Sequence, residues 1–304
     1  MPVSRRTLIQ SGVGMVLASS LPRVAFSELS LGSSTLTTVS DGSLTLPVSF
    51  VFDPMPQDEL EPIRREFALE GEQLQPECNL ALYRDGTNTV LFDVGSGPDF
   101  MPTAGKILDA LDAVDVAPED VTHVIFTHAH PDHIWGLLDE FDEPLFYEAS
   151  YMMGRAEWDY WWNPNTVNEI GEARAAFAVG AKRRMEAIED KVELIDDGQE
   201  VLPGIAAILT PGHTPGHMAF EVREGNAAAL IVGDAIGNHH VAFRKPAWKS
   251  GSDQDQETAA LTRKMLFDRL TNEDMSLIGF HLPDGGMGRA VKDGDGYRFV
   301  GEEK

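Results

Sequence analysis

The chain has 304 residues, 42% of them hydrophobic, and its glycines and prolines are scattered, which excludes a fibrous or largely disordered protein. A formal net charge of −25 disfavours nucleic acid as a partner, because that binding depends on Lys and Arg neutralising phosphates. The single cysteine, Cys78, excludes an intramolecular disulfide, and the apolar run that follows it indicates a buried thiol.

The N-terminus resembles a twin-arginine export signal. Arg5 and Arg6 directly precede a mildly apolar stretch, residues 8–21, that is too short and too polar for a membrane span of about 20 apolar residues. We therefore predict a cleaved signal over residues 1–26, a single domain over residues 27–304 without a membrane span, and a periplasmic or secreted mature protein. The alternative is an unstructured N-terminus without a targeting role.

The rest of the chain alternates between strand and helix patterns. Strands are expected at 34–39 and 44–46 around an Asp41-Gly42 hairpin turn, and at 80–83 and 89–92 around Asp85-Gly86. Further strands are expected at 123–126, 144–147, 192–195, 206–209, 218–222, 228–232, 276–280 and 297–300, and helices at 60–69, 107–114, 169–189 and 257–270. Strands outnumber helices in both halves, which predicts two sheets packed face to face with helices outside.

A cluster of polar residues follows the strand expected at 123–126. It contains four potential metal ligands, His128, His130, Asp132 and His133. His128 and His130 are two residues apart, so an extended backbone points both to the same side, and Pro131 then turns the chain so that the other two face a second point. Three imidazoles and a carboxylate cannot be buried together unless a metal or hydrogen bonds satisfy them, so the segment predicts a metal site.

Three more candidate ligands come later in the chain. His213, Asp234 and His281 each follow an apolar run, as expected where the strands of a sheet end at a site.

With these residues in this order, the chain resembles the metallo-β-lactamase superfamily over roughly residues 34–300. The resemblance implies a four-layer αβ/βα sandwich. It also implies that one metal is held by His128, His130 and His213, that the other is held by Asp132, His133 and His281, and that Asp234 bridges the two.

The resemblance further implies hydrolysis of an ester-like bond in a small molecule: a lactone, a carboxylate ester or a phosphotriester. Imidazole and carboxylate suit Zn²⁺, and two such ions about 3.5–4 Å apart lower the pKa of a shared water. Asp132 and Asp234 are assigned to catalysis as well as to metal binding. Iron and manganese are the alternative metals, but iron-binding redox members carry Glu where this chain has His130, which favours a hydrolase.

Within the superfamily the chain is most similar to the methyl parathion hydrolase-like and N-acyl-homoserine lactonase-like branch, through residues 157–162, 280–283 and 293–297. Trp158, Trp161 and Trp162 are expected to line an apolar pocket, or alternatively to pack between a helix and the sheet. Trp135 stands where the superfamily usually has glycine, and a ring beside the site would narrow it.

Several neighbouring residues are given supporting roles. Asp93 is expected to orient a ligand or to form the turn before Gly95, and His217 to make structural hydrogen bonds. His239 and His240 are expected in a solvated loop rather than in the pocket. The rival functions are a β-lactamase and a non-catalytic periplasmic metal-binding protein, and the sequence leaves a homodimer open.

Overall fold

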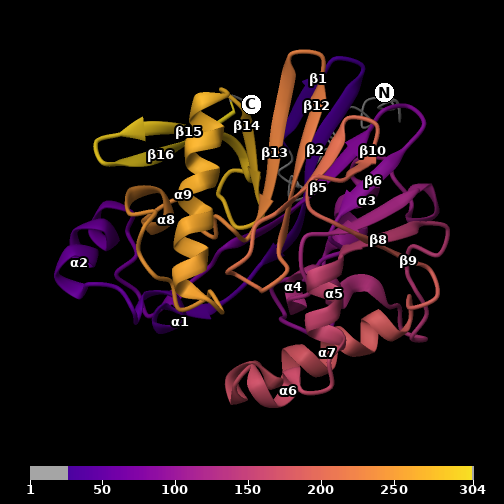
Figure 1. Cartoon of the computed structure of the whole chain (residues 1–304), viewed down its shortest axis with the longest axis horizontal. Coiled ribbons are helices and arrows are strands. Elements are labelled where there is room, and N and C mark those ends of the chain that lie inside the picture. Colours follow the sequence, from indigo (N-terminus) through magenta and orange to yellow (C-terminus); the bar gives the residue numbers. More distant parts are fainter. Residues whose placement is uncertain (1–26, 303–304) are drawn as a thin grey trace, which may run out of the picture.

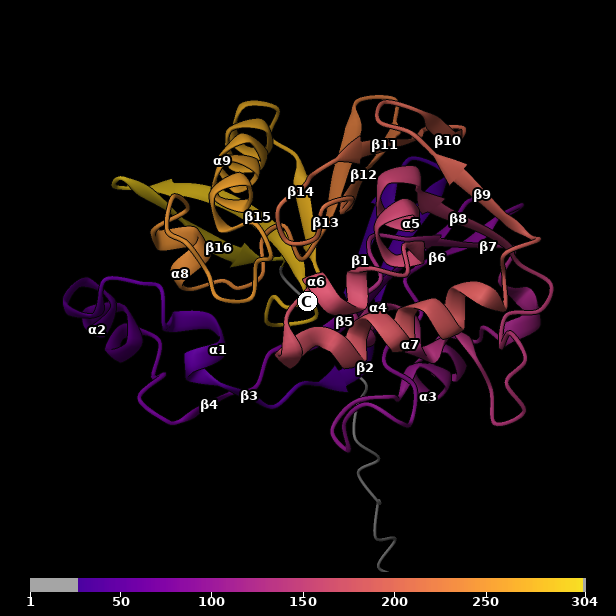
Figure 2. The same cartoon turned by 60° about the horizontal axis from the view of Figure 1, so that its bottom comes forward.

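Two facing sheets with helices on both outer sides make up the computed structural model, which describes residues 27–302 (Figures 1 and 2). The predicted export signal, residues 1–26, lies outside the described residues. The first sheet has the order β1 (Glu28–Leu31), β2 (Ser34–Ser43), β5 (Glu77–Arg84), β6 (Thr89–Phe92), β7 (His123–Phe126), β8 (Ser150–Gly154) and β9 (Val192–Ile195). The second has the order β10 (Glu200–Leu202), β11 (Ile205–Leu209), β12 (Met218–Glu224), β13 (Ala227–Gly233), β14 (Ser276–Gly279), β15 (Met287–Asp293) and β16 (Gly296–Gly301).

Helices cover the outer face of each sheet. On the first sheet lie α3 (Ile107–Asp112), α5 (Arg155–Trp162), α6 (Thr166–Glu169) and α7 (Ala175–Glu186); near the second lie α8 (Val241–Arg244) and α9 (Gln256–Asn272). The short helix α4 (Pro131–Ile134) follows β7. A separate small unit consists of β3 (Leu46–Pro47), α1 (Val48–Phe52), α2 (Gln57–Glu66) and β4 (Gln73–Leu74). Within residues 27–302, every helix is too short or too polar to span a bilayer.

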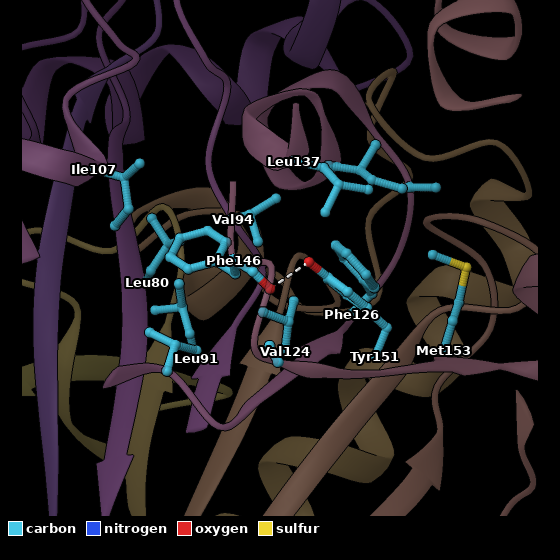
Figure 3. Close-up of a cluster of buried hydrophobic side chains, with 14 of the residues drawn as sticks. Leu80, Leu91, Val94, Ile107, Val124, Phe126, Leu137, Phe146, Tyr151 and Met153 are labelled. Carbon is cyan, nitrogen blue, oxygen red and sulfur yellow. Dashed lines mark hydrogen bonds between the residues drawn. The ribbon is translucent and has the colours of Figure 1, made fainter. Parts of the chain in front are cut away.

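The alternation of side chains along the strands builds the layers. On β5, Leu80 and Leu82 point outward to the helices, whereas Ala81 and Tyr83 point inward to the other sheet. Figure 3 shows the outward-facing cluster, in which the hydroxyl of Tyr151 donates to the carbonyl of Phe146 over 2.7 Å. Side chains from both sheets fill the middle of the molecule, so the predicted four-layer sandwich is confirmed.

Parallel pairing decides where the sheets present polar residues. Strands β6, β7, β8 and β9 run parallel to one another, and β13 runs parallel to β14. The carboxyl ends of parallel neighbours lie at the same edge, so the loops that follow β6, β7, β13 and β14 are gathered at one edge of the sandwich.

The hairpin predicted at Asp41-Gly42 is wrong, because β2 continues through these residues and pairs with β5 across a bulge. The Asp41 carboxylate is buried and accepts hydrogen bonds from the backbone of Ser96, Gly105, Lys106 and Ile107 at 2.7–3.1 Å. Asp41 therefore anchors the start of α3 and does not form a turn.

Two other elements differ from the sequence predictions. Residues 144–147 are not a strand, and the strand that pairs with β7 begins at Ser150. Phe146 is buried in the loop before that strand, which gives the loop the apolar pattern of a strand. The helix predicted over 169–189 is divided, because Gly171 adopts a φ of 92° between α6 and α7 and helices do not continue through such a residue.

Several elements were not predicted at all: the strands β1, β4, β10 and β15 and the helices α1, α4, α5 and α8. The helix α2 was predicted, but it begins at Gln57 instead of near Leu60. The segment 44–46 joins the small β3–β4 pair and not the first sheet.

Candidate metal centre

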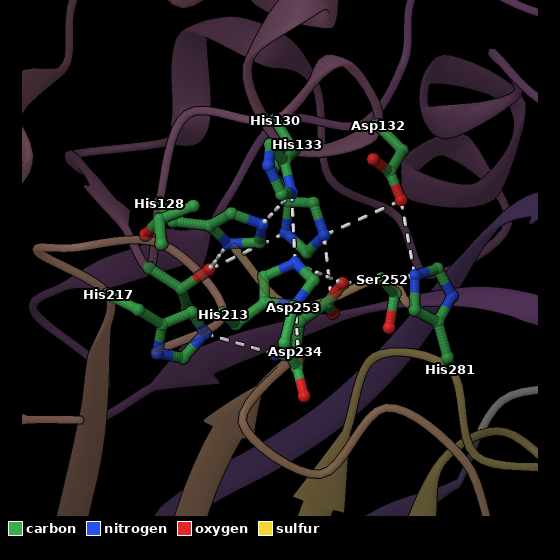
Figure 4. A network of polar contacts seen from close by, with 12 residues as sticks. His128, His130, Asp132, His133, His213, His217, Asp234, Ser252, Asp253 and His281 are labelled. Atoms are coloured by element: carbon green, nitrogen blue, oxygen red, sulfur yellow. Dashed lines mark hydrogen bonds and ion pairs between the residues drawn. The ribbon is translucent and has the colours of Figure 1, made fainter. Parts of the chain in front are cut away.

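Four loops supply the candidate ligands. The segment after β7 carries His128, His130, Asp132 and His133; the loop between β11 and β12 carries His213. Asp234 directly follows β13, and His281 comes two residues after the end of β14. The structure brings all seven side chains together in one buried cluster (Figure 4).

The first group consists of His128, His130 and His213. The Nε2 atom of His128 lies 3.0 Å from Nδ1 of His130, which lies 2.9 Å from Nε2 of His213. A tetrahedral zinc ion with bonds of about 2.0–2.1 Å separates its nitrogen ligands by about 3.3 Å, so the spacing suits one such ion.

The second group consists of Asp132, His133, Asp234 and His281. The Nε2 atom of His281 lies 3.2 Å from Oδ2 of Asp132 and 3.3 Å from Oδ2 of Asp234, and Nε2 of His133 lies 3.4 Å from Oδ1 of Asp234. Asp234 also reaches the first group, since its Oδ2 lies 3.3 Å from Nε2 of His213. This carboxylate therefore stands between the two groups.

Some buried polar atoms of these groups lack a hydrogen-bond partner, which indicates whether cations would fit there. Oδ2 of Asp132, Nε2 of His133 and Oδ1 of Asp234 are buried, and none has a hydrogen-bond partner in the described part of the chain. Orphaned polar atoms in the interior are costly and rare. Bound divalent cations would satisfy all three, so the donor set fits two divalent metal ions.

For three of the candidate ligands, hydrogen bonds on the far side of the ring set the tautomer. Nδ1 of His133 faces Oδ2 of Asp93 at 2.9 Å, Nδ1 of His213 faces Oδ1 of Asp253 at 3.1 Å, and Nδ1 of His281 faces the carbonyl of Glu77 at 2.7 Å. A ring that donates from Nδ1 keeps the lone pair on Nε2 free, which is the arrangement of histidines that bind metals.

The electrostatics differ between the two groups. Burial, with the neighbouring imidazoles, holds the pKa of His128 and His130 well below its ordinary value, so both rings are neutral. Burial opposes the charged form of His133 too, but the carboxylates of Asp234, Asp132 and Asp93 raise its pKa to about 10. The second group thus attracts positive charge strongly.

Asp93 combines both roles that were predicted for it. It has a φ of 64°, the turn conformation, and its carboxylate accepts hydrogen bonds from the backbone and hydroxyl of Thr127 at 2.7 and 2.8 Å. Its contact with His133 links the end of β6 to the ligand loop.

Two buried acids were not found from the sequence. Asp253 holds His213 and is itself paired with Arg263 at 2.7 Å. Glu157 on α5 accepts from the backbone of Ala129 at 2.9 Å and of Gly216 at 3.1 Å, which ties the two ligand loops together. In the sequence Glu157 lies between Arg155 and Asp159, so nothing there marks it as buried.

A cavity of about 210 Å³ opens onto the ligands, well above the roughly 10–15 Å³ that one water needs. Its polar end is formed by His130, Asp132, His213, Asp234 and His281. Its apolar walls are formed by Leu44, Leu46, Phe50, Val51, Leu69, Leu74, Phe100 and Phe177.

The four tryptophans predicted for the pocket do not line this cavity, which corrects that prediction. Trp161 is buried behind His130 with ring centroids 5.7 Å apart, and its Nε1 donates to Glu157. Trp158 and Trp162 stack on each other. Trp135 lies behind Phe100. These rings fill the space between helices and sheet, and the apolar walls come instead mostly from the segment 44–74, with Phe100 and Phe177.

His239 and His240 line the cavity, contrary to the solvated loop that was expected. His217 makes structural hydrogen bonds, since its Nε2 accepts from the backbone of Asp234 at 3.1 Å and its Nδ1 faces Thr210 at 2.8 Å. Cys78 is buried, and burial raises the pKa of its thiol to about 12, so it is no nucleophile at neutral pH.

Curated relatives match parts of the chain. N-acyl homoserine lactonase AttM of Agrobacterium fabrum is 30% identical over 128 residues, which are 41% of this chain and 44% of that protein. The uncharacterized protein YobT of Bacillus subtilis is 31% identical over 175 residues, 54% of this chain and 70% of that protein. The chain thus spans less than half of the lactonase that it matches.

Solved structures share the whole fold. AidC, a dizinc quorum-quenching lactonase in complex with its product, aligns with a TM-score of 0.86 at 24% identity, over 92% of this chain and 98% of that one. Hydrolase AbOPH aligns with a TM-score of 0.85 at 24% identity over the same shares. The family model described as metallo-beta-lactamase superfamily matches residues 76–271, which is more than half of the sequence, so the chain belongs to that superfamily.

Proposed function

We propose that this protein is a metal-dependent hydrolase that cleaves an ester-like bond in a small, partly apolar molecule. The observation that carries the proposal is the position of the seven ligands, which converge at the polar end of an apolar cavity. Ligand sites of enzymes commonly combine apolar walls with a few convergent polar groups. The superfamily membership and the solved neighbours support the same reaction class.

Two bound divalent ions, for which we propose zinc, would lower the pKa of a water and polarise the substrate's carbonyl oxygen. The chain's own contribution is to hold and aim the reacting groups. Asp132 lines the cavity and contacts His133 and His281 only through Oδ2. We propose that its Oδ1 accepts the proton of the attacking water and passes it to the leaving oxygen.

We propose a lactone with an N-acyl chain as the first substrate to test. The names of matched relatives, N-acyl homoserine lactonases of Agrobacterium fabrum and Bacillus cereus, support this class. The apolar walls would take up the acyl chain while the lactone carbonyl lies at the polar end.

A substrate panel on protein of known metal content tests the proposal. We expect turnover of an N-acyl homoserine lactone, with weaker turnover of an aryl ester and a phosphotriester. Efficient cleavage of a chromogenic cephalosporin would indicate a β-lactamase instead. Full metal loading without turnover of any compound would indicate a non-catalytic metal-binding protein.

Removal of a single ligand should abolish both metal retention and activity. We expect His128→Ala and Asp234→Ala to lose most bound metal and nearly all turnover, because each removes a donor from a buried group. His123→Ala is the matched control, since this histidine lies on β7 only five residues before His128 and contacts Thr122 instead. Wild-type turnover in both ligand variants would refute the assignment.

We also propose that residues 1–26 direct export by the twin-arginine route. Replacing Arg5 and Arg6 with lysine should leave the unprocessed protein inside the cell, whereas the wild-type chain should be processed and exported. Equal export of both chains would contradict the proposal.

A further inference from the structure

Gly180 lies inside helix α7, where glycine destabilises a helix relative to alanine. The space beside it explains its presence. A Cβ atom on residue 180 would lie 2.3 Å from Cζ2 and 2.4 Å from Cε2 of Trp135, closer than any real contact. The glycine therefore makes room for the indole of Trp135, and the two residues form a matched pair.

The indole of Trp135 makes no hydrogen bond within the described part of the chain. Its Nε1 is buried and has no hydrogen-bond partner among residues 27–302, and the guanidinium of Arg184 lies 4.7 Å from the ring centre. A buried indole N–H usually finds an acceptor. The missing acceptor indicates that position 135 requires the shape of the indole ring and not its hydrogen bond.

Trp135 supports the cavity wall from behind. Its ring packs edge-on against Phe100 with centroids 5.5 Å apart, and Phe100 packs against Phe177 at 6.3 Å. Both phenylalanines line the cavity, whereas Trp135 does not. Phe177 also packs against the candidate ligand His130 at 5.7 Å, so the layer of rings extends to the metal centre.

We propose that Trp135, seated against Gly180, sets the width of the cavity through Phe100 and Phe177, and so determines which acyl chains the enzyme accepts. The inference rests on the proposed function. Interiors are close-packed, so a ring behind the wall prevents Phe100 from moving away from the cavity. Trp135 is a specificity-determining residue that does not touch the substrate.

The substitutions Trp135→Leu and Gly180→Ala should shift the preference for acyl-chain length in opposite directions. Trp135→Leu leaves space behind Phe100, so kcat/KM for a dodecanoyl substrate relative to a butanoyl substrate should rise about ten-fold or more, mainly through KM. Gly180→Ala pushes the indole toward Phe100, so the same ratio should fall. In the double variant Trp135→Leu/Gly180→Ala the clash is absent, and the second change should have no effect on the ratio.

A matched control shows whether a changed ratio comes from the cavity wall or from the loss of any tryptophan near it. Trp162→Leu makes the same chemical change in a tryptophan that stacks on Trp158 and does not line the cavity, and it should keep the wild-type ratio. Metal content should equal that of wild type in every variant. If Trp135→Leu does not fold, Trp135→Phe carries the same prediction with a smaller shift.

Binding distinguishes failure of this inference from failure of the proposed function. Dissociation constants of straight-chain fatty acids, from butanoate to dodecanoate, are measured by calorimetry on metal-loaded wild type and variants. A shift toward longer chains in Trp135→Leu supports the inference even if no lactone is hydrolysed. An unchanged chain-length profile in folded Trp135→Leu, or an equal shift in Trp162→Leu, overturns it.

Discussion

At the scale of single residues, the candidate metal centre depends on the side chains that orient the candidate ligands as well as on those ligands. Asp253 is buried between Nδ1 of His213 and the guanidinium of Arg263. Its carboxylate fixes the ring that completes the first metal group and also neutralises a buried cation.

Asp253→Ala should therefore weaken metal binding and stability together. Loss of a group that orients a ligand typically lowers metal affinity by about 10–100-fold, and an unpaired buried arginine costs about 3–5 kcal/mol. Metal content after dialysis and a denaturant titration measure the two effects. Asp274→Asn, at an exposed ion pair with Arg289, is the control, and wild-type metal retention in Asp253→Ala would contradict the assigned role.

The clustering of the candidate ligands was predictable from the sequence, whereas the buried acids that contact them were not. His128, His130, Asp132 and His133 form a run that has no place in an apolar core, so the chemistry itself reveals them. Asp253 and Glu157 look like ordinary surface acids in the sequence. Only the fold shows that their side chains are buried against ligand loops.

At the scale of elements, strands that form apolar runs and the long helix α9 were recovered, whereas segments with a mixed polar and apolar sequence, such as β15 and α5, were not. Both faces of β5 and β7 are buried, so these strands appear in the sequence as continuous apolar runs. The segment 44–74 forms most of the apolar wall, and its short α1, β3 and β4 carry too few residues to show a period. The cavity wall was therefore predicted in the wrong place, at the tryptophans of α5.

One carboxylate joins the two sheets at the end away from the metal centre. Glu224, at the end of β12, accepts hydrogen bonds from the backbone of Ser33 at 2.9 Å and from the hydroxyls of Ser33 and Ser34 at 2.8 Å. The bonds from Ser33 and Ser34 lower the pKa of Glu224 from 4.5 to about 2.

The lowered pKa predicts how stability depends on pH. Because the folded state favours the ionised form, the contribution of Glu224 is complete above about pH 4.5 and is lost as the pH falls toward about 2. Glu224→Gln should be less stable than wild type at neutral pH, and the difference should shrink as the pH falls through this window. Denaturant midpoints of both proteins across the range measure it; a difference that does not change with pH would contradict the interpretation.

At the scale of the whole molecule, the net charge of −25 is the dominant feature. Self-repulsion of this size opposes compact folding, and salt screens it, since the Debye length falls from about 10 Å at 0.1 M to about 3 Å at 1 M. The homodimer that the sequence leaves open stays a prediction for light scattering, and like charges on two copies would oppose it at low salt.

The melting temperature should rise with sodium chloride, most steeply at low concentrations where screening changes fastest. An uncharged osmolyte at equal osmolarity should not reproduce this steep initial rise. A melting temperature that stays constant or falls over the same salt range would show that repulsion between the acidic side chains does not limit stability.

We propose that hydrolysis requires both neighbouring cation sites, with Asp234 as the carboxylate that they share. The most direct measurement adds zinc in steps to the chelated protein and records metal content and hydrolysis of an N-acyl homoserine lactone on each sample. We predict that turnover reaches its plateau only when two ions are bound per chain, and that Asp234→Ala neither holds two ions nor turns over. Full turnover in the metal-free protein, or in Asp234→Ala, would contradict the account.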